Sequence, residues 1–135
     1  MKKPKKPKTT AQLRKLAWNA FSKWYRKSQA DALGRVRCYT CGTWSHWTQM
    51  QSGHAIPGRH AAVLFDEEII RPQCPRCNGN WGLRGNYQVF VPKLIREHGF
   101  DGLDWWDEKL REARRIVKFT RQDLLDKIAD YESRI

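Results

Sequence analysis

Hydrophobic positions near the start of the chain follow a helical period. Between residues 9 and 33 they recur every three or four positions, and Thr9 or Thr10 can cap the start of such a helix. Gly34 follows as a stop signal. We therefore predict an N-terminal helix over residues 9–33. Its apolar stripe consists of Leu13, Leu16, Ala17, Ala20, Phe21, Trp24 and Tyr25.

The middle of the chain lacks this period, and its pattern predicts short β structure. Residues 35–47, RVRCYTCGTWSHW, have the pattern of a strand, a cysteine turn and a second strand. More short extended segments are expected at residues 49–54 and within residues 62–71.

Helical spacing returns after residue 86 and continues through the C-terminal third. It predicts helices over residues 87–99 and 101–119 and a last helix that begins at Thr120 with Asp123 as its capping partner. The predicted fold class is α+β. A small centre at residues 35–86 is flanked by the N-terminal helix and by two or three helices within residues 87–135, and residues 9–135 form a single domain.

Charge adds a prediction about the partner. The chain has 135 residues with 26 Lys and Arg against 14 Asp and Glu, and a net charge of +12. Such an excess predicts binding to a polyanion. The first eight residues, MKKPKKPK, predict a disordered basic arm. No run of 18 apolar residues and no apolar signal stretch is present, so we expect no membrane span and a cytoplasmic location.

Two Cys-x-x-Cys pairs, Cys38 with Cys41 and Cys74 with Cys77, predict one metal site. In a reducing compartment, metal binding is favoured over two disulfides. Four thiolates bind zinc tetrahedrally and leave no open position, so this Zn²⁺ is expected to be structural. The 32 residues between Cys41 and Cys74 exceed the simplest two-knuckle spacing, which indicates an insert with a role of its own.

The insert carries candidates for a second, catalytic centre. It contains His46, His54 and His60, and Asn78 follows the last cysteine directly. Histidine can accept a proton near neutral pH, and an amide oxygen can bind a divalent cation that offsets charge on a phosphate. Blander alternatives exist: His54 could close a hairpin, and Asn78 could cap the helix that follows.

These motifs resemble the NinG/Rap family of phage recombination endonucleases, which act on branched DNA. The resemblance covers about half of the chain, through the segments CYTCGTWSHW, QSGH, PGR, VLFDEE, RPQCPRCNGN, RGNY and LIREHG, in order and with the family's spacing. It implies an HNH-like ββα-metal centre stapled by zinc. It also implies that His54 is the general base or a metal ligand, and that Asn78 binds a catalytic divalent metal, Mg²⁺ or Mn²⁺.

One position departs from the NinG/Rap pattern, and another departs only from that of the wider HNH group. Ile69 stands where an asparagine usually holds the loop, and Gly53 stands where the wider HNH group often has Asp or His. The missing metal ligand is therefore expected elsewhere, and Ile69 favours the alternative function of a non-catalytic zinc-containing DNA-binding phage regulator. The further candidate ligands are His60, Asp66, Glu67 and Glu68.

The resemblance also implies partners for the chain. We expect DNA, in particular Holliday junctions or similar branches, as substrate in the cytoplasm of a phage-infected host, and a homodimer that cuts opposing strands. Trp44 or Trp81 could wedge into a junction. The side chains expected to bind DNA are Arg59, Arg71, Arg76 and Arg84, together with Lys2, Lys3, Lys5, Lys6 and Lys8 of the arm.

Overall fold

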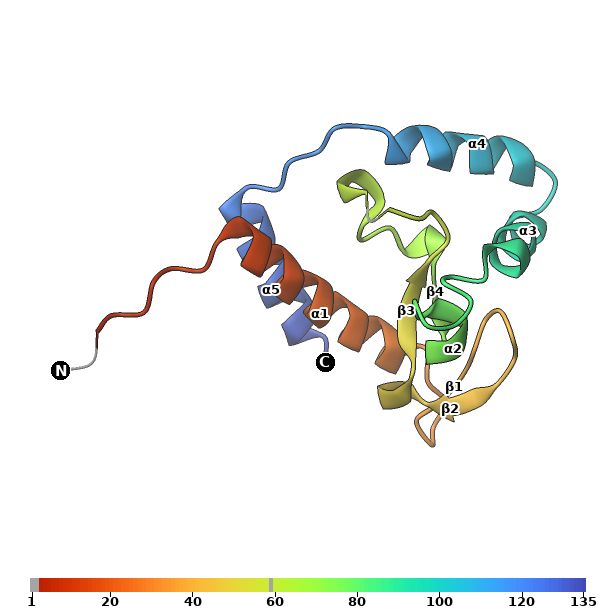
Figure 1. Ribbon diagram of the computed structural model, residues 1–135, viewed down its shortest axis with the longest axis horizontal. Coiled ribbons are helices and arrows are strands. Elements are labelled where there is room, and N and C mark those ends of the chain that lie inside the picture. Colours follow the sequence, from red (N-terminus) through yellow and green to blue (C-terminus); the bar gives the residue numbers. More distant parts are fainter. Residues whose placement is uncertain (1–2, 59) are drawn as a thin grey trace.

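In the computed structural model, which describes residues 3–58 and 60–135, helices surround two small antiparallel sheets (Figure 1). This mixture confirms the predicted α+β class. No helix of the described residues is long and apolar enough to cross a bilayer. The elements are α1 (Thr10–Ser28), β1 (Arg35–Arg37), β2 (Trp44–His46), β3 (Gln51–His54), β4 (Ile70–Gln73), α2 (Pro75–Asn78), α3 (Tyr87–His98), α4 (Gly102–Ala113) and α5 (Arg121–Ser133).

The first and last helices begin at the predicted caps. The Thr9 side chain accepts from the Gln12 backbone N–H while the Gln12 side chain accepts from the Thr9 N–H, and Thr120 and Asp123 form the same reciprocal pair at α5. These boxes satisfy backbone donors that the helix itself cannot pair. Residues 3–8, the described part of the basic arm, have no regular secondary structure and are exposed.

Helices α1 and α5 lie side by side and run in the same direction (Figure 1). Leu13 packs with Leu124 near the two starts, and the rings of Phe21 and Tyr131 meet edge to face further along, with centroids 5.1 Å apart. The last helix therefore buries the apolar stripe of the first. Residues 114–120 are long enough to cross from α4 to the start of α5.

The second sheet, β3–β4, forms the centre of the molecule. Gln51 pairs with Gln73 and His54 with Ile70, and the strands are joined by residues 55–69. This connection holds two 3-10 turns, Ala61–Val63 and Glu67–Ile69, so the expectation of extended structure from residue 62 was wrong before Ile70. The Asp66 side chain accepts from the Glu68 N–H and favours a turn over a strand.

The main core joins α1, the hairpin and the C-terminal helices. It includes Phe21, Ile70, Phe90, Ala113 and Tyr131, one residue from each of five elements. The buried hydroxyl of the neighbouring α1 residue Tyr25 donates to the Ile70 carbonyl at 2.7 Å. Burial raises the pKa of this tyrosine to about 12. The helix thus packs on the hairpin with its polar atom paired.

Two predicted helices end earlier than expected. The first ends at Ser28 rather than near residue 33, because the Asp31 carboxylate accepts from the backbone N–H groups of Leu33 and Arg35 and forms a turn instead. The fourth helix ends at Ala113 rather than at residue 119. The segment that follows contains Phe119, whose ring packs edge to face against Phe65.

Truncating Phe21 should cost more stability than any surface change on the same helix. Its ring is fully buried among the aromatic residues of α1 and α5, so Phe21→Ala should lower the free energy of unfolding by about 3–5 kcal/mol. The exposed Lys23→Ala should change it by less than about 0.5 kcal/mol. Urea unfolding followed by circular dichroism measures both, and equal effects would contradict this description of the core.

Candidate metal centre and cleft

Four thiols from two distant segments converge beside the β3–β4 hairpin. Cys38 and Cys41 come from the β1–β2 turn, and Cys74 and Cys77 from the start of α2. Their sulfur atoms all lie within 4.8 Å of one another. Cys41 Sγ is 3.7 Å from Cys74 Sγ, across the two segments. Among the described residues this is the one group of three or more His, Cys, Asp or Glu side chains that could hold a metal ion, and its donors suit zinc.

Hydrogen bonds around the cysteines favour thiolates at part of this cluster. Burial opposes ionisation of Cys38, but hydrogen bonds from the backbone of Cys74 and from Thr40 outweigh burial and lower the pKa of Cys38 to about 6. Burial raises the pKa of the Cys77 thiol to about 12. A bound cation is the ordinary means by which four close sulfurs are all kept ionised.

Gln73 locks the thiol cluster to the hairpin and explains why position 53 is glycine. Its buried Nε2 donates to Thr40 Oγ1 at 3.1 Å and to the Gly85 carbonyl at 2.9 Å. A Cβ at Gly53 would lie 1.8 Å from Gln73 Oε1, so a side chain fits there only if Gln73 leaves its buried position. An Asp or His ligand at position 53 is therefore incompatible with this packing.

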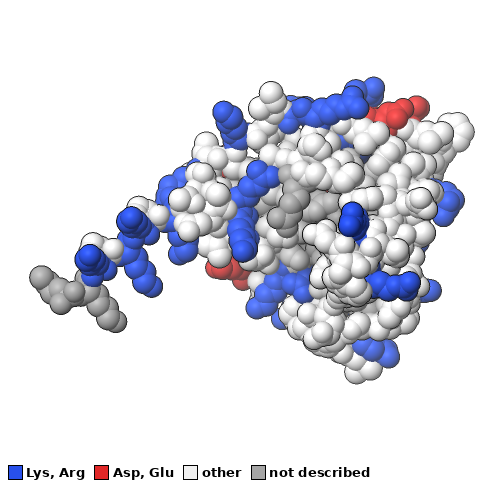
Figure 2. Space-filling model, in the orientation of Figure 1, with Lys and Arg blue, Asp and Glu red and all other residues white. Residues whose placement is uncertain are grey.

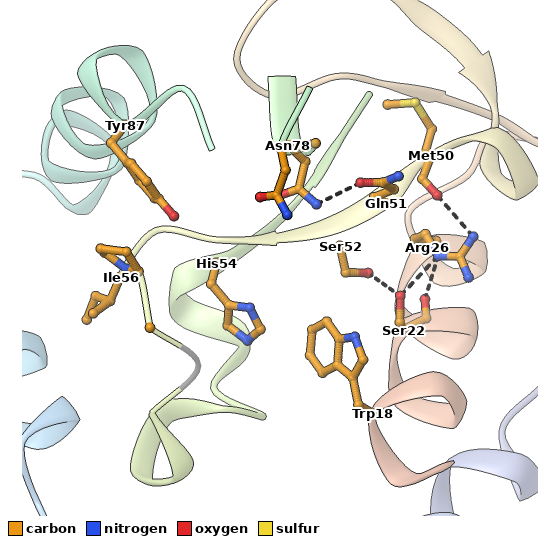
Figure 3. Close-up of a pocket in the computed structure, with 14 residues that line it drawn as sticks. Trp18, Ser22, Arg26, Met50, Gln51, Ser52, His54, Ile56, Asn78 and Tyr87 are labelled. Atoms are coloured by element: carbon orange, nitrogen blue, oxygen red, sulfur yellow. Dashed lines mark hydrogen bonds between the residues drawn. The ribbon is translucent and has the colours of Figure 1, made fainter. Parts of the chain in front are cut away.

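A cleft of about 700 Å³ opens between α1, β3 and the end of α2 (Figure 3). Both His54 and Asn78, the two catalytic candidates of the sequence, line it. The other described lining residues are Trp18, Ser22, Arg26, Met50, Gln51, Ser52, Ile56, Pro57, Gly58, Gly79, Asn80 and Tyr87.

The His54 ring is fixed from two sides. Its Nε2 lies 2.9 Å from the Leu64 carbonyl oxygen, and its plane stacks on Trp18 with ring centroids 4.6 Å apart (Figure 3). Because a carbonyl only accepts, Nε2 carries the proton in this hydrogen bond, and the neutral ring then has its lone pair on Nδ1. This tautomer is suited to accepting a proton at Nδ1.

Asn78 is oriented by the neighbouring strand. It is the last residue of α2, and its Nδ2 donates to Gln51 Oε1 at 2.8 Å. With the amide nitrogen used in this way, the amide oxygen is the atom suited to bind a cation. The alternative role as a cap for the following helix was wrong, because Asn86 holds the N-cap position of α3.

Comparison with known proteins supports the resemblance over the whole chain. The family model described as bacteriophage lambda NinG protein matches residues 1–135. The chain belongs to the NinG family. Membership marks it as a phage recombination-related protein. Searches of curated proteins and of solved structures returned no match.

The further metal ligands proposed for this NinG-family chain lie outside the cleft lining. Lys109 Nζ, on α4, binds Asp66 Oδ2 at 2.7 Å and Glu68 Oε2 at 2.8 Å. This hydrogen bond from Lys109 lowers the pKa of Glu68. The two carboxylates thus fasten α4 to the loop between β3 and β4.

Among the four candidate ligands, His60 approaches the cleft most closely, since a Cβ on the cleft residue Gly58 would be 3.0 Å from His60 Nε2. The carbonyl oxygen of Glu67 accepts from Arg71 at 2.9 Å.

The arginines proposed to bind DNA divide into two groups. Arg76 and Arg84 are exposed beside the end of α2. Arg71 pairs with Gly53, one register step from His54, so its side chain leaves the opposite face of the hairpin. There its Nη1 donates to the carbonyls of Glu67 and Ile70. Lys3, Lys5, Lys6 and Lys8 are exposed in the arm, whereas Lys2 and Arg59 lie outside the described residues.

Arg26 is the cleft residue whose place the sequence did not reveal. Its Nη1 donates to the carbonyls of Trp47 and Met50, both at 3.1 Å, and its Nε donates to Ser22 O. Burial lowers the pKa of this guanidinium. The sequence could have indicated that Arg26 lies beside Trp18 and Ser22, because these residues are four positions apart and therefore share one helix face.

The surface charge of the protein is mostly positive where it is drawn: on the face shown in Figure 2, Lys and Arg outnumber Asp and Glu.

Zinc removal should loosen the end of α2 and the cleft with it. We expect the purified protein to contain one zinc per chain, and Cys41→Ser or chelation to lower both metal content and the melting temperature. Element analysis and thermal unfolding measure these quantities. Restoration by zinc but not by magnesium is the control, and a chelated protein with unchanged stability would exclude a structural metal.

Proposed function

We propose that this protein is a metal-dependent DNA endonuclease that hydrolyses phosphodiester bonds in branched or recombination-intermediate DNA. The observation that carries the proposal is the shared cleft of His54 and Asn78, whose side chains are each oriented by a hydrogen bond, His54 to the Leu64 carbonyl and Asn78 to Gln51. The β3–β4 hairpin followed by α2 is the arrangement expected of an HNH-like centre, and NinG-family membership favours the same reaction.

His54 acts as general base in this mechanism. Its Nδ1 takes a proton from a water molecule, and the water oxygen forms a bond to phosphorus. The bond from phosphorus to the leaving oxygen breaks with its electron pair on that oxygen, which takes a proton from solvent water. Trp18 and the Leu64 carbonyl keep the ring in place while it changes charge. A carbonyl that accepts from Nε2–H also stabilises the imidazolium that forms.

The Asn78 amide oxygen would hold the divalent cation, Mg²⁺ or Mn²⁺. Hard oxygen donors suit these ions, which commonly retain several waters and substrate oxygens beside a few protein ligands. The cation supplies charge neutralisation at the scissile phosphate. The single amide at Asn78, supported by Gln51 and close to Asn80 in the same cleft, fits such a sparse ligand set.

Arg26 positions the DNA backbone next to the cutting site. Its guanidinium is already ordered by two carbonyls, so little side-chain entropy remains to be lost when a phosphate binds. Ser22 and Ser52, whose hydroxyls are 2.8 Å apart, line the cleft between Arg26 and His54. The arm lysines add sequence-independent affinity, and a homodimer would supply the two centres that a branched substrate needs.

The alternative of a non-catalytic regulator depended on Ile69. This side chain is fully buried in the main core, and its carbonyl accepts from the Ala55 N–H at 2.9 Å. Apolar burial and a backbone hydrogen bond therefore hold the loop that an asparagine side chain would otherwise hold. Replacement of that asparagine leaves His54 and Asn78 in one cleft, which supports the catalytic function over the alternative.

Removing the imidazole should slow cutting strongly and leave DNA binding intact. With magnesium or manganese and branched DNA, His54→Ala should cleave about 10²- to 10⁴-fold more slowly than the parent. His98→Ala, in the last turn of α3 and outside the cleft lining, is the matched control and should cleave normally. Gel assays on branched and linear DNA measure the rates. Tight binding by a parent protein that never cuts would favour the regulator.

Removing the cleft arginine should change the salt dependence of binding. A plot of log affinity against log salt has a negative slope. Arg26→Gln should make this slope shallower by about one, the value for one lost phosphate contact. Lys27→Gln changes the same charge at an exposed neighbour outside the cleft lining. Fluorescence anisotropy at several salt concentrations measures the slopes. An Arg26→Gln slope equal to the parent's would remove Arg26 from the phosphate-binding set.

A further inference from the structure

Residues 79–86, between α2 and α3, present two large apolar side chains to solvent. Trp81 is 75% exposed and Leu83 46%. An exposed indole two residues from a second exposed apolar side chain, on an ordered segment, forms an apolar patch that a partner can cover. The exposed residues in the surrounding sequence include Arg76 and Arg84, and residues 75–86 contain no Asp or Glu. The contact surface is therefore apolar with a cationic border.

The backbone of this segment is held by the structure beneath it. Leu83 N–H donates to the Arg76 carbonyl at 2.8 Å, and Gly85 N–H donates to the carbonyl of the zinc-site residue Cys77 at 2.7 Å. Arg84 adopts a left-handed backbone conformation, with φ of 52°, and its N–H donates to the Gly79 carbonyl. Trp81 is thus carried by a tight turn fastened to the thiol cluster.

The indole stands at the border of the cleft. A Cβ on Gly79 would be 2.9 Å from Trp81 Nε1, so the ring packs on the backbone of this glycine. Gly79 and Asn80 both line the cleft together with His54. A group that contacts the exposed side of Trp81 therefore lies next to whatever occupies the cleft.

Trp44 does not share this position. It is 57% exposed on β2, with the Arg35 guanidinium 6.0 Å from its ring centroid. Neither Trp44 nor any other residue of the β1–β2 hairpin is among the described cleft residues. The geometry therefore separates the two tryptophans that the sequence left equivalent, and Trp44 is a natural control.

We propose that Trp81 stacks on a nucleobase exposed at the branch point of the DNA, with Leu83 packed beside it, and so places the adjoining phosphodiester in the cleft. Bases within a linear duplex are already stacked on both faces, whereas a branch exposes base faces at little cost. An indole stacks on any base, so the contact reads DNA shape and not sequence. The proposal rests on the proposed function and deepens it, because the stack would determine which phosphodiester bond of the branched DNA is cut.

Binding without cleavage isolates the stack. With the full-length zinc-loaded protein and no added magnesium or manganese, Trp81→Ala should bind branched DNA about 5- to 150-fold more weakly, the range for one lost base–aromatic stack. Its affinity for linear duplex of the same sequence should be nearly unchanged. Trp81→Phe should stay within about threefold of the parent on branched DNA, and Trp44→Ala should match the parent on both.

A fluorescent base gives a second readout. With 2-aminopurine at the branch point, the parent and Trp81→Phe should change its emission on binding, and Trp81→Leu should not. Leucine keeps apolar packing on Gly79 without a flat ring, so it serves if the alanine variant fails to fold. Zinc content and thermal unfolding confirm that each variant compared is folded.

Three results would overturn the inference. They are equal loss of affinity for branched and linear DNA, parent-like branch preference in both Trp81→Leu and Trp81→Ala, and a loss of dimer in light scattering with unchanged DNA binding. Cutting by the parent alongside any of these leaves the nuclease standing without the stack. Absence of cutting by the parent, with a Trp81-dependent preference for branches, removes the nuclease and retains the stack.

Discussion

The structure depends on the convergence of four sulfur atoms from two segments that are 32 residues apart in the sequence. Four thiolates at such separations repel one another unless a cation lies among them. When the four sulfurs are held together, the β1–β2 turn fixes the start of α2. Helix α2 in turn fixes Asn78 and the turn that carries Trp81. The four cysteines thus set the geometry of the cleft without lining it.

The opposite wall of the cleft comes from the first helix. Trp18, Ser22 and Arg26 share one face of α1. The first stacks on His54, the second pairs with Ser52, and the third presents a cation. The other face of the same helix packs against α5. One face of α1 therefore lines the cleft, and the opposite face packs in the core against α5.

Local signals in the sequence predicted the elements that depend on local physics. The thiol cluster and the caps at Thr9 and Thr120 followed from residue type and distance along the chain. The presence of His54 and Asn78 in one cleft was implied by the family resemblance. The other features of the site depend on contacts between segments that are distant in the sequence. Helical periodicity puts Arg26 on one face with Trp18 and Ser22, but only the approach of Met50 shows that this face lines a cleft.

The acidic residues illustrate the same limit. A run of Asp66, Glu67 and Glu68 near a candidate site is consistent with metal ligation, and nothing nearby in the sequence indicates otherwise. Lys109 lies more than forty residues later and pairs with two of them. Likewise, the glycine at position 53 is explained by the buried amide of Gln73 and not by any feature of its own strand.

The parallel packing of α1 and α5 has a consequence for synthesis on the ribosome. Every described cleft residue has been made once Tyr87 is added, yet the stripe of α1 finds its cover only when Leu124 and Tyr131 have left the exit tunnel. The nascent chain therefore carries all the described cleft residues before the helix that lines one wall of the cleft has its full packing. Completion of the cleft is timed by the final helix.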